Sequence, residues 1–458
     1  MGWYGLIEVW VITESTVPRK TRNNIITVHT NGVCKMNEDI NAQAGSGIWI
    51  NKDNIINKAC RVPGLNQNTE TGELYAAEYT ACKIPKDIQL KIESKSKYMI
   101  NAITSSLPYY KDKGWIGVKN AYEIKRTVAW LRQRGSNTLL EYVDNHINNT
   151  GNKEANQQAI KGQKETSCPK VNLRTPIQLN LQGVKLSCLT QATAYKAIRK
   201  KTITKEHKST MINLDITQYA AKDLSRHTPT DSQIWLSIRS KDMTRTIRNF
   251  LWMMLHNAYK CGRYWDNIPN YSHRAICLKC GAEESLEHIL IDCRQIPAQN
   301  IIWKLCEQLW ENTGNQWPQI TYGKILACGL AQFHNKNNQL LYGKNRLYRI
   351  LISESAFLIW KLRCERRIAK QDDETKWHSK TEIHNRWVSS INQRLTLDCQ
   401  IARTYTNKKE NLNPKLVLHT WSSCLYEEEK LPDDWIRQPG VLVGIPYLKN
   451  NGSPTRSA

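Results

Sequence analysis

The sequence predicts an α/β domain over residues 23–163, followed by a mainly α-helical region. Two early stretches have the pattern of strands: Asn24–His29 (NIITVH) alternates apolar and polar residues, and Ala44–Ile50 (AGSGIWI) is led by small residues. Glu70–Lys83 (ETGELYAAEYTACK) has the apolar spacing of a helix. From Ile234 the apolar residues follow a helical period, and 458 residues suffice for two or three domains.

The remaining elements of the α/β domain follow in order along the chain. A third strand is expected near Lys58–Val62. The next elements are expected in the order strand, helix, helix, strand, helix, at Ile88–Glu93, Tyr98–Leu107, Val118–Arg134, Leu139–Val143 and Glu154–Gly162. Five strands interleaved with helices indicate one sheet covered by helices.

The other segments are assigned from their composition. Residues 164–230 are polar and basic and predict a linker, and residues 449–458 predict a disordered tail. Residues 1–22 form an N-terminal leader with no assigned fold. The helical region divides into a domain at 231–315 and a C-terminal region at 316–448.

The charge balance predicts a polyanionic partner. Lys and Arg total 65 against 41 Asp and Glu, a formal charge of +24, which favours nucleic acid, with an anionic membrane surface as the second candidate. No apolar run reaches the ~18 residues of a membrane span, so no membrane insertion is expected. The first residues have no basic leader, so we expect an intracellular protein, in the nucleus or cytoplasm, with reduced cysteines. No small-molecule cofactor is expected.

Six segments of the α/β domain resemble motifs of the ribonuclease H family. They are TNGV (residues 30–33), AGSGIWI (44–50), GEL (72–74), SKSKYMINAI (94–103), KGWIGVKNAYEI (113–124) and YVDNHINNTGNKEANQQA (142–159). They occur in the family's order across residues 23–163. The resemblance implies a ribonuclease H-like fold with a five-stranded mixed sheet, and an enzyme that cuts the RNA strand of RNA–DNA hybrids.

The family's catalytic positions have lost most of their charge in this chain. In that family four carboxylates hold two Mg²⁺ ions, which activate water for attack on phosphate. The four positions here are Asn31, Glu73, Lys95 and Asn156, so only Glu73 is acidic. The site charge changes from about −4 to near zero, and at ~4 Å each unit-charge pair is worth ~4 kcal/mol for an effective dielectric of ~20. Loss of metal binding and of cleavage is therefore expected.

Nearby acidic residues do not compensate on sequence grounds. Glu93 faces the same way as Lys95 on one strand but is ~7 Å away along it. Glu154 points away from Asn156 on its helix. The resemblance also places His146 in the family's glycine–histidine slot, where it follows Asn145 and reads as a loop histidine.

A short basic and aromatic cluster is a candidate for gripping a nucleic-acid backbone. It comprises Lys111, Lys113 and Trp115. The alternative is that Trp115 belongs to the core.

A second constellation has the spacing of a metal site. Cys277, Cys280, His288 and Cys293 form the pattern C-x2-C-x7-H-x4-C. Three thiolates and one imidazole are the ligands of a closed structural Zn²⁺ site, which leaves no open position for catalysis. The alternative is ordinary buried cysteines beside a surface histidine.

The surroundings of this cluster resemble the zinc-binding domain that follows reverse transcriptases in non-LTR retroelements. RNFLWMMLHNAY (residues 248–259) precedes the cluster and IIWKLCEQLW (301–310) follows it. Together with the first domain, the chain resembles the C-terminal part of a fungal retrotransposon polyprotein. Just upstream, a further nucleic-acid contact surface is expected on a single helix that presents Arg239, Lys241, Arg245 and Arg248.

The functional hypothesis is a nucleic-acid-binding protein of ribonuclease H-like fold with a defective catalytic site and a structural zinc. The partner would be an RNA–DNA hybrid, RNA or DNA. One alternative is an Mg²⁺-dependent hybrid ribonuclease with a rearranged site, the only case in which Mg²⁺ would be required. The other is a zinc-organised scaffold for protein interactions.

Overall fold

The computed structural model describes residues 9–12, 22–37, 39, 41–144, 149–167, 183–202, 207–403, 412–449 and 454–455. It forms two compact units, Met1–Lys205 and Glu206–Ala458. Among the helices of these residues, none is long and apolar enough to cross a membrane.

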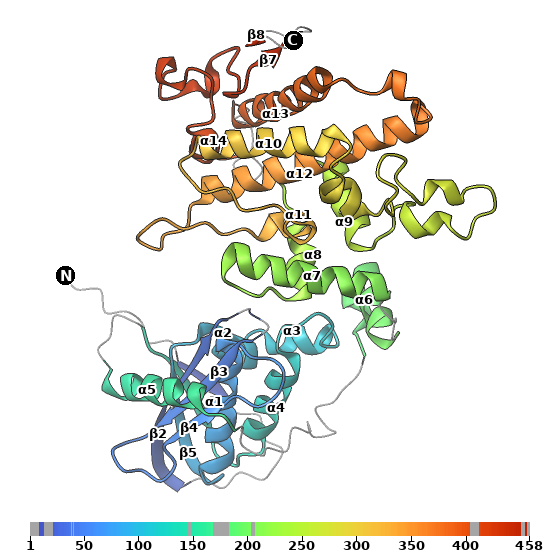
Figure 1. Ribbon diagram of the computed structural model, residues 1–458. Helices are drawn as coiled ribbons and strands as arrows, with labels where there is room; N and C mark the ends of the chain where they lie inside the picture. The colour runs from blue at the N-terminus through green and yellow to red at the C-terminus, as the bar shows by residue number, and fades with distance from the viewer. Residues whose placement is uncertain are drawn as a thin grey trace. The chain divides into compact units, whose positions relative to one another are not determined.

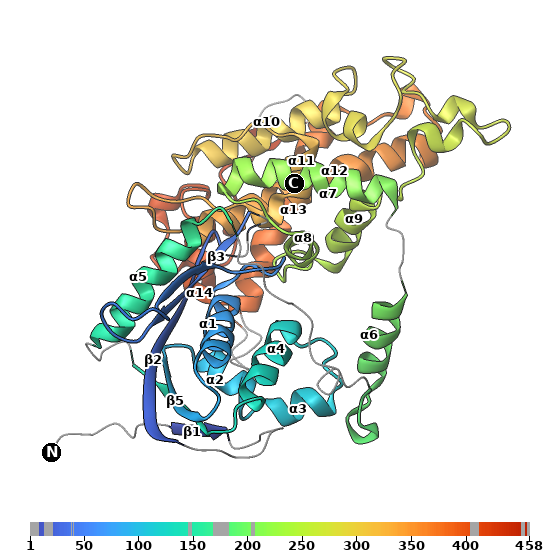
Figure 2. The same cartoon turned by 90° about the horizontal axis from the view of Figure 1, so that it is seen from below.

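Unit 1 is built on a mixed sheet with the strand order β1-β6-β5-β2-β3-β4. Strands β6, β5 and β2 form a parallel group at the centre of the sheet. On one side β3 pairs antiparallel with β2 and β4 with β3, and on the other side β1 pairs antiparallel with β6. In Figure 2, β2 is the long curved strand of this sheet. The strands are β1 (Val9–Ile12), β2 (Arg22–Lys35), β3 (Gln43–Trp49), β4 (Lys58–Arg61), β5 (Ile88–Ser94) and β6 (Thr138–Tyr142).

The prediction of five strands was one strand short. Val9–Ile12, in the segment assigned as a leader, forms β1 and pairs with β6 in register from Val9–Glu141 to Ile12–Thr138. Its sequence VWVI has the β-branched and aromatic residues that suit a strand. The pairing satisfies the backbone groups that β6 would otherwise expose at the sheet edge.

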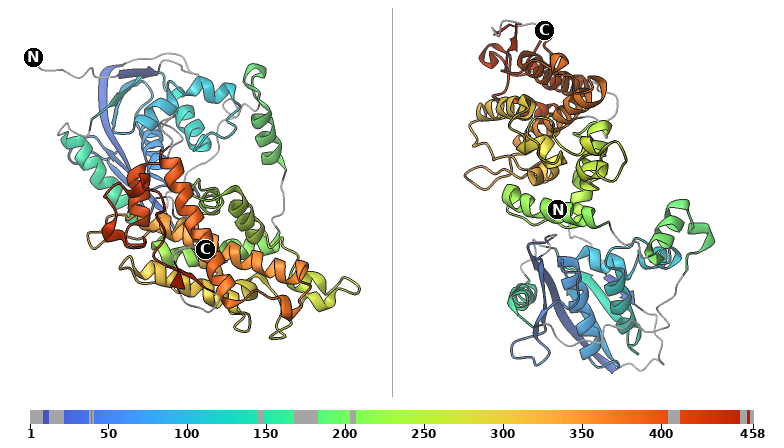
Figure 3. Two further views of the ribbon diagram at one scale, coloured as in Figure 1. Left: turned by 90° about the horizontal axis from the view of Figure 1, so that it is seen from above. Right: turned by 45° about the vertical axis from the view of Figure 1, so that its right-hand side comes forward.

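Helices cover both faces of this sheet. Helices α1 and α4 lie on one face and α5 on the other (Figure 1 and Figure 3, right). Strand β3 allows the closest approach, because a Cβ added to Gly47 would lie 1.9 Å from the Ala155 carbonyl oxygen of α5. The helices are α1 (Thr69–Lys83), α2 (Lys97–Ile103), α3 (Leu107–Asp112), α4 (Ala121–Arg132), α5 (Thr150–Lys164) and α6 (Gln191–Lys201).

Helix α1 starts where its sequence provides a cap. The Asn68 side chain accepts a hydrogen bond from the Thr71 backbone N–H (2.8 Å), and the Thr71 hydroxyl accepts one from the Asn68 N–H (3.1 Å). Such a reciprocal pair satisfies two donors that the first turn leaves free. The cap fixes the start of the helix one turn before Glu73.

Unit 2 is mainly helical and surrounds one apolar core. Helices α10, α12 and α13 run alongside one another (Figure 1). The largest fully buried side chains of the protein include Trp310, Trp387 and Trp421. The predicted boundary between residues 231–315 and 316–448 is not visible in this core, which both segments share. The helices are α7 (Lys208–Ser225), α8 (Asp231–Ser237), α9 (Arg245–Leu255), α10 (Pro297–Glu311), α11 (Tyr322–Leu326), α12 (Tyr342–Cys364), α13 (Lys380–Arg403) and α14 (Pro414–Trp421).

The assignment of residues 164–230 as a linker was wrong for much of its length. Helices α6 and α7 lie within it, and α7 places Leu214, Ala221 and Leu224 in the unit 2 core. These positions lie seven and three residues apart, so they share one face of the helix. The polar and basic composition of residues 164–230 made this apolar face hard to detect from the sequence. In the predicted disordered tail, Pro454–Thr455 forms β8, which pairs with β7 (Tyr447–Leu448).

The contact between β3 and α5 predicts a strong effect of one added methyl group. We expect Gly47→Ala to push α5 away from β3 and to lower the free energy of unfolding of unit 1 by about 1–3 kcal/mol or more. Loss of hydrogen-exchange protection in β3 and α5 measures the effect. Gly444→Ala is the control, because its Cβ would meet its nearest heavy atom at 3.4 Å. Equal behaviour of the two variants would contradict this account of the packing.

Candidate functional sites

Glu73, the acidic residue of the expected quartet, is a buried carboxyl on α1. It is 4% exposed, its Oε2 accepts a hydrogen bond from Ser94 Oγ (3.1 Å), and its carboxylate also accepts from the Gly32 backbone N–H. Burial raises the pKa of Glu73 to about 8, although these two hydrogen bonds act to lower it. The one acidic member of the quartet is therefore mostly protonated at pH 7.

The other three positions lie on neighbouring elements. Asn31 is buried on β2 and stands opposite Gly47 of β3. Lys95 directly follows Ser94, the last residue of β5, which pairs with Thr30. Asn156 is half-buried on α5, the helix that packs on β2 and β3. The four positions therefore lie on, or directly after, elements that pack against one another, and besides Glu73 they carry two amides and one ammonium.

Glu93 is engaged elsewhere. Its Oε2 lies 3.2 Å from His29 Nδ1 and accepts a hydrogen bond from Asn149 Nδ2 (2.9 Å), and its Oε1 lies 2.9 Å from Lys91 Nζ. The adjacent His29 imidazole and then the Lys91 ammonium lower the pKa of Glu93 to about 2, against the effect of burial. Both oxygens are occupied by internal donors, so Glu93 does not stand as a free replacement ligand.

Sequence reasoning missed two features of this region. Ser94 is the hydroxyl partner of Glu73, and it could have been suspected only from its place at the end of a strand next to Lys95. Asn152 is fully buried on α5, and within the described residues its side-chain amide makes no hydrogen bond. His146 lies outside the described residues.

The expected basic and aromatic cluster of unit 1 is only partly at the surface. Trp115 is 7% exposed and belongs to the core, with Lys125 Nζ 5.1 Å from its ring centroid. Lys113 Nζ lies over the Tyr109 ring at 5.4 Å, and Lys111 is half-buried. The assignment of Trp115 as a base-stacking residue was therefore wrong, because its ring is buried in the core and is not available to a base.

The four basic residues expected on a single helix do not share one. Helix α8 ends at Ser237 and α9 begins at Arg245, where the Thr244 side chain caps it by accepting from the Ile247 N–H. Arg239 and Lys241 lie in the connecting turn. Periodicity did not detect the break, because the polar residues between the helices also fit a helical surface.

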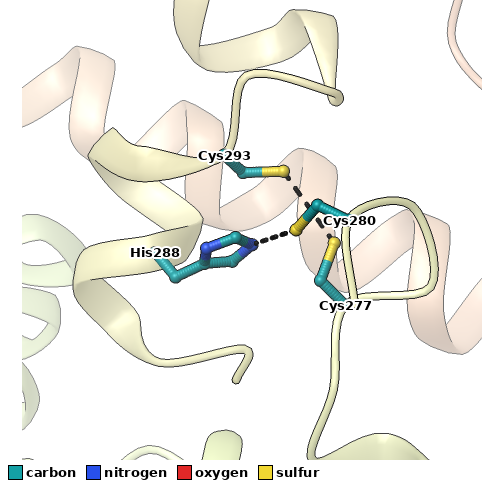
Figure 4. A group of neighbouring side chains, drawn as sticks. All are labelled: Cys277, Cys280, His288 and Cys293. Atoms are coloured by element: carbon teal, nitrogen blue, oxygen red, sulfur yellow. Dashed lines mark hydrogen bonds between the residues drawn. The ribbon is translucent and has the colours of Figure 1, made fainter. Parts of the chain in front are cut away.

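The side chains of the cysteine and histidine cluster come together in the folded chain. The four ligand atoms of Cys277, Cys280, His288 and Cys293 lie within 4.8 Å of one another, and Figure 4 shows the side chains converging from a loop and from a helical turn. The Cys277 and Cys293 sulfurs are 3.8 Å apart, and Cys280 Sγ is 3.4 Å from His288 Nε2. Zn–S bonds of about 2.3 Å and a Zn–N bond of about 2.0 Å at tetrahedral angles require separations of about 3.8 and 3.5 Å. The donor set is compatible with zinc.

The thiols of the cluster influence each other. Burial raises the pKa of Cys293 to about 11, and the nearby Cys277 sulfur adds to this rise. At Cys277 burial also acts to raise the pKa, but hydrogen bonds from His288 and from the Cys280 and Lys279 backbone outweigh it and lower the pKa to about 7. A cation would stabilise all the thiolates together, because it neutralises their mutual repulsion.

A buried ion cluster joins the loop of this cysteine and histidine cluster to the end of α12 and to the helical turn Glu365–Ala369 that follows it. Glu284 is 1% exposed and accepts hydrogen bonds from three guanidinium groups, those of Arg363, Arg366 (2.9 Å) and Arg367 (3.0 Å). Burial acts to raise the pKa of Glu284, but the three cations, Arg363 first, outweigh it and lower the pKa.

The buried state of Glu73 predicts a pH dependence. A carboxyl whose pKa rises from 4.5 to about 8 on folding stabilises the folded state most below pH 4.5 and loses this contribution as the pH rises through about 8. Relative to Glu73→Gln, the wild type should lose up to about 1.4 kcal/mol of unfolding free energy per pH unit in this window. Urea unfolding at a series of pH values measures the difference. Glu165→Gln, an exposed carboxyl, is the control, and parallel curves for wild type and Glu73→Gln would contradict the prediction.

Comparisons with known proteins agree with the fold of unit 1. Residues 23–164 match the family model for RNase H. A ribonuclease H from Schizosaccharomyces pombe is 30% identical over 143 residues, which cover 30% of this chain and 53% of that protein. A ribonuclease H from Ruthia magnifica is 27% identical over 136 residues, covering 28% of this chain and 88% of that protein. The chain thus spans about half the length of the first relative.

Solved structures also match this region. The RNase H domain of PFV covers 31% of this chain and 95% of its own length, with 18% identity and a TM-score of 0.25. LC9-RNase H1, a type 1 RNase H with the type 2 active-site motif, covers 40% of this chain and 87% of its own length, with 14% identity and a TM-score of 0.28. On the family match and the sheet order together, residues 23–164 have the ribonuclease H-like fold.

Proposed function

We propose that this protein binds nucleic acid through a ribonuclease H-like domain that does not cleave it. The observation that carries the proposal is the composition of the quartet: Asn31, Lys95 and Asn156 supply no anionic oxygen, and Glu73 is a buried carboxyl whose pKa burial raises. Two-metal hydrolysis requires a cage of hard anionic ligands. A site of this composition repels Mg²⁺ at Lys95 and holds no permanent negative charge to attract it.

The loss of acidic groups favours binding to phosphate. Removing carboxylates from a site that faces a polyanion removes repulsion, and a chain with a formal charge of +24 supplies long-range attraction. The relatives are named ribonucleases H, so the proposed ligand of this domain is an RNA–DNA hybrid. We also propose a retroelement origin, on the resemblance of the two units to consecutive parts of such a polyprotein.

The first test uses a labelled RNA–DNA hybrid with Mg²⁺ or Mn²⁺. We expect binding without cleavage by the wild type, and an affinity that falls steeply with salt because each phosphate contact adds about 0.9 to the slope of log K against log salt. The triple variant Asn31→Asp, Lys95→Asp, Asn156→Asp changes the site charge by about −4, and we expect it to bind Mg²⁺ and to weaken hybrid binding when metal is absent.

Two outcomes would contradict this proposal. Cleavage by the wild type that disappears in Glu73→Gln would show a working nuclease with a rearranged site. A complete absence of hybrid binding at low salt would favour the scaffold. The variant Glu165→Gln serves as the control for both assays, because Glu165 is exposed at the end of α5.

We further propose that the cluster of three cysteines and one histidine holds a structural Zn²⁺. With four protein ligands the ion has no open position, so its contribution is to the folding of unit 2. The purified protein should contain one equivalent of zinc. Cys280→Ser should lose it and lower the thermal stability of unit 2, whereas Cys82→Ser, at an exposed cysteine outside the cluster, should keep it. A wild-type content below about half an equivalent would refute the site.

A further inference from the structure

A cleft of about 820 Å³ lies in unit 2, between the segment of residues 258–278 and the C-terminal end of α12. This volume is within the roughly 300–1,000 Å³ of typical ligand sites. One wall carries Tyr259, Lys260, Trp265, His273, Arg274 and Leu278, and the other carries Trp360, Arg363, Arg367 and Ile368. We call it the aromatic cleft.

The aromatic cleft is lined by flat groups that are fixed in place. The Arg274 guanidinium carbon lies 5.3 Å from the Trp265 ring centroid and 4.8 Å from that of Tyr271. Trp265 Nε1 donates a hydrogen bond to the Lys260 carbonyl oxygen (2.9 Å). On the opposite wall, the rings of Tyr259 and Trp360 are 4.3 Å apart. Planar groups that are already ordered lose little entropy when a ligand stacks on them.

Arg367, in the helical turn that follows α12, joins the two walls through hydrogen bonds. Arg367 Nη2 donates hydrogen bonds to the carbonyl oxygens of Arg274 (3.1 Å) and Ile276 (2.8 Å). The same guanidinium group also binds the carboxylates of Glu284 and Asp372, so four acceptor groups fix its position. The shape of the aromatic cleft therefore depends on contacts within unit 2 and does not require a ligand.

The charge of the aromatic cleft is positive. Lys260, Arg274, Arg363 and Arg367 line it, and Asp372 is the acidic residue among its lining groups. Glu284 and Asp372 neutralise part of the α12 arginines. Among the described residues, no carboxylate pairs with Lys260 or Arg274; Lys260 instead lies over the Tyr264 ring at 5.5 Å. Two cations are therefore available to a ligand.

We propose that the aromatic cleft binds single-stranded nucleic acid, with bases stacked on its aromatic and guanidinium planes and phosphates at Lys260 and Arg274. Flat rings interleaved with cations are the combination that binds unpaired bases and their backbone. A duplex does not fit this chemistry, because its base faces are already stacked on each other. The inference rests on the proposed nucleic-acid-binding function and assigns a second site, separate from the hybrid-binding domain.

The test measures binding of the full chain to a fluorescent oligo(dT) of about 12 nucleotides, a length suited to a single stacking groove. We expect Arg274→Ala and Trp265→Leu each to weaken binding roughly tenfold. Lys260→Ala should reduce the magnitude of the slope of log K against log salt concentration by about 0.7, because one phosphate contact is lost. Trp265→Leu should leave this slope unchanged. Trp265→Phe keeps a stacking ring and should retain most of the affinity, which separates stacking from misfolding.

The controls separate this site from the rest of the protein. Arg263→Ala removes an exposed arginine of the same segment that pairs with Glu283 and does not line the cleft, so it should bind oligo(dT) as the wild type does. Hybrid binding should be unaffected in all these variants.

Unchanged oligo(dT) binding in Arg274→Ala and Trp265→Leu would overturn the inference while the proposed function stands. Equal competition by poly-glutamate at matched charge would also overturn it, in favour of an acidic peptide. Absence of binding to both probes would remove both proposals.

Discussion

The organisation of unit 2 depends on one buried carboxylate, Glu284. Arg363 at the end of α12, and Arg366 and Arg367 in the helical turn Glu365–Ala369 that follows it, donate to this carboxylate. Glu284 lies between Cys280 and His288 in sequence, so it joins the cysteine and histidine cluster to the C-terminal end of α12. Desolvating this many charges is costly, and the cluster is stable only because its partners are complete. Loss of the carboxylate would remove the ion-pair partner of Arg363 and leave Arg366 and Arg367 with Asp372. Two of these arginines, Arg363 and Arg367, also line the second wall of the aromatic cleft.

Unit 1 shows the opposite use of a buried carboxyl. Among the described residues Glu73 forms no ion pair, and its hydrogen bonds with Ser94 and Gly32 only partly offset the cost of burial. Burial therefore raises the pKa of Glu73 and favours its protonated form. This direction agrees with the proposed loss of the Mg²⁺ site, because a bound cation would favour the ionised carboxylate.

The two proposed surfaces bind different features of nucleic acid. In these proposals the ribonuclease H-like domain binds a helical duplex, and the aromatic cleft offers flat groups for exposed bases. A protein that holds a duplex and an adjacent single strand gains from both contacts, because the second binding event becomes intramolecular. The high positive charge adds a salt-dependent attraction that is common to both surfaces.

The sequence by itself determined the features that depend on local pattern. Alternating and small-residue strands predicted an α/β domain over residues 23–163, and the resemblance of six segments implied its ribonuclease H-like fold. The spacing of Cys277, Cys280, His288 and Cys293 predicted that these side chains come together, since they lie in one short stretch. Only the tertiary structure decided the features that depend on burial and on distant segments. It placed Trp115 in the core, raised the pKa of Glu73 and brought α12 against residues 258–278. Desolvation and packing arise from residues far apart in the chain, so no local pattern reports them.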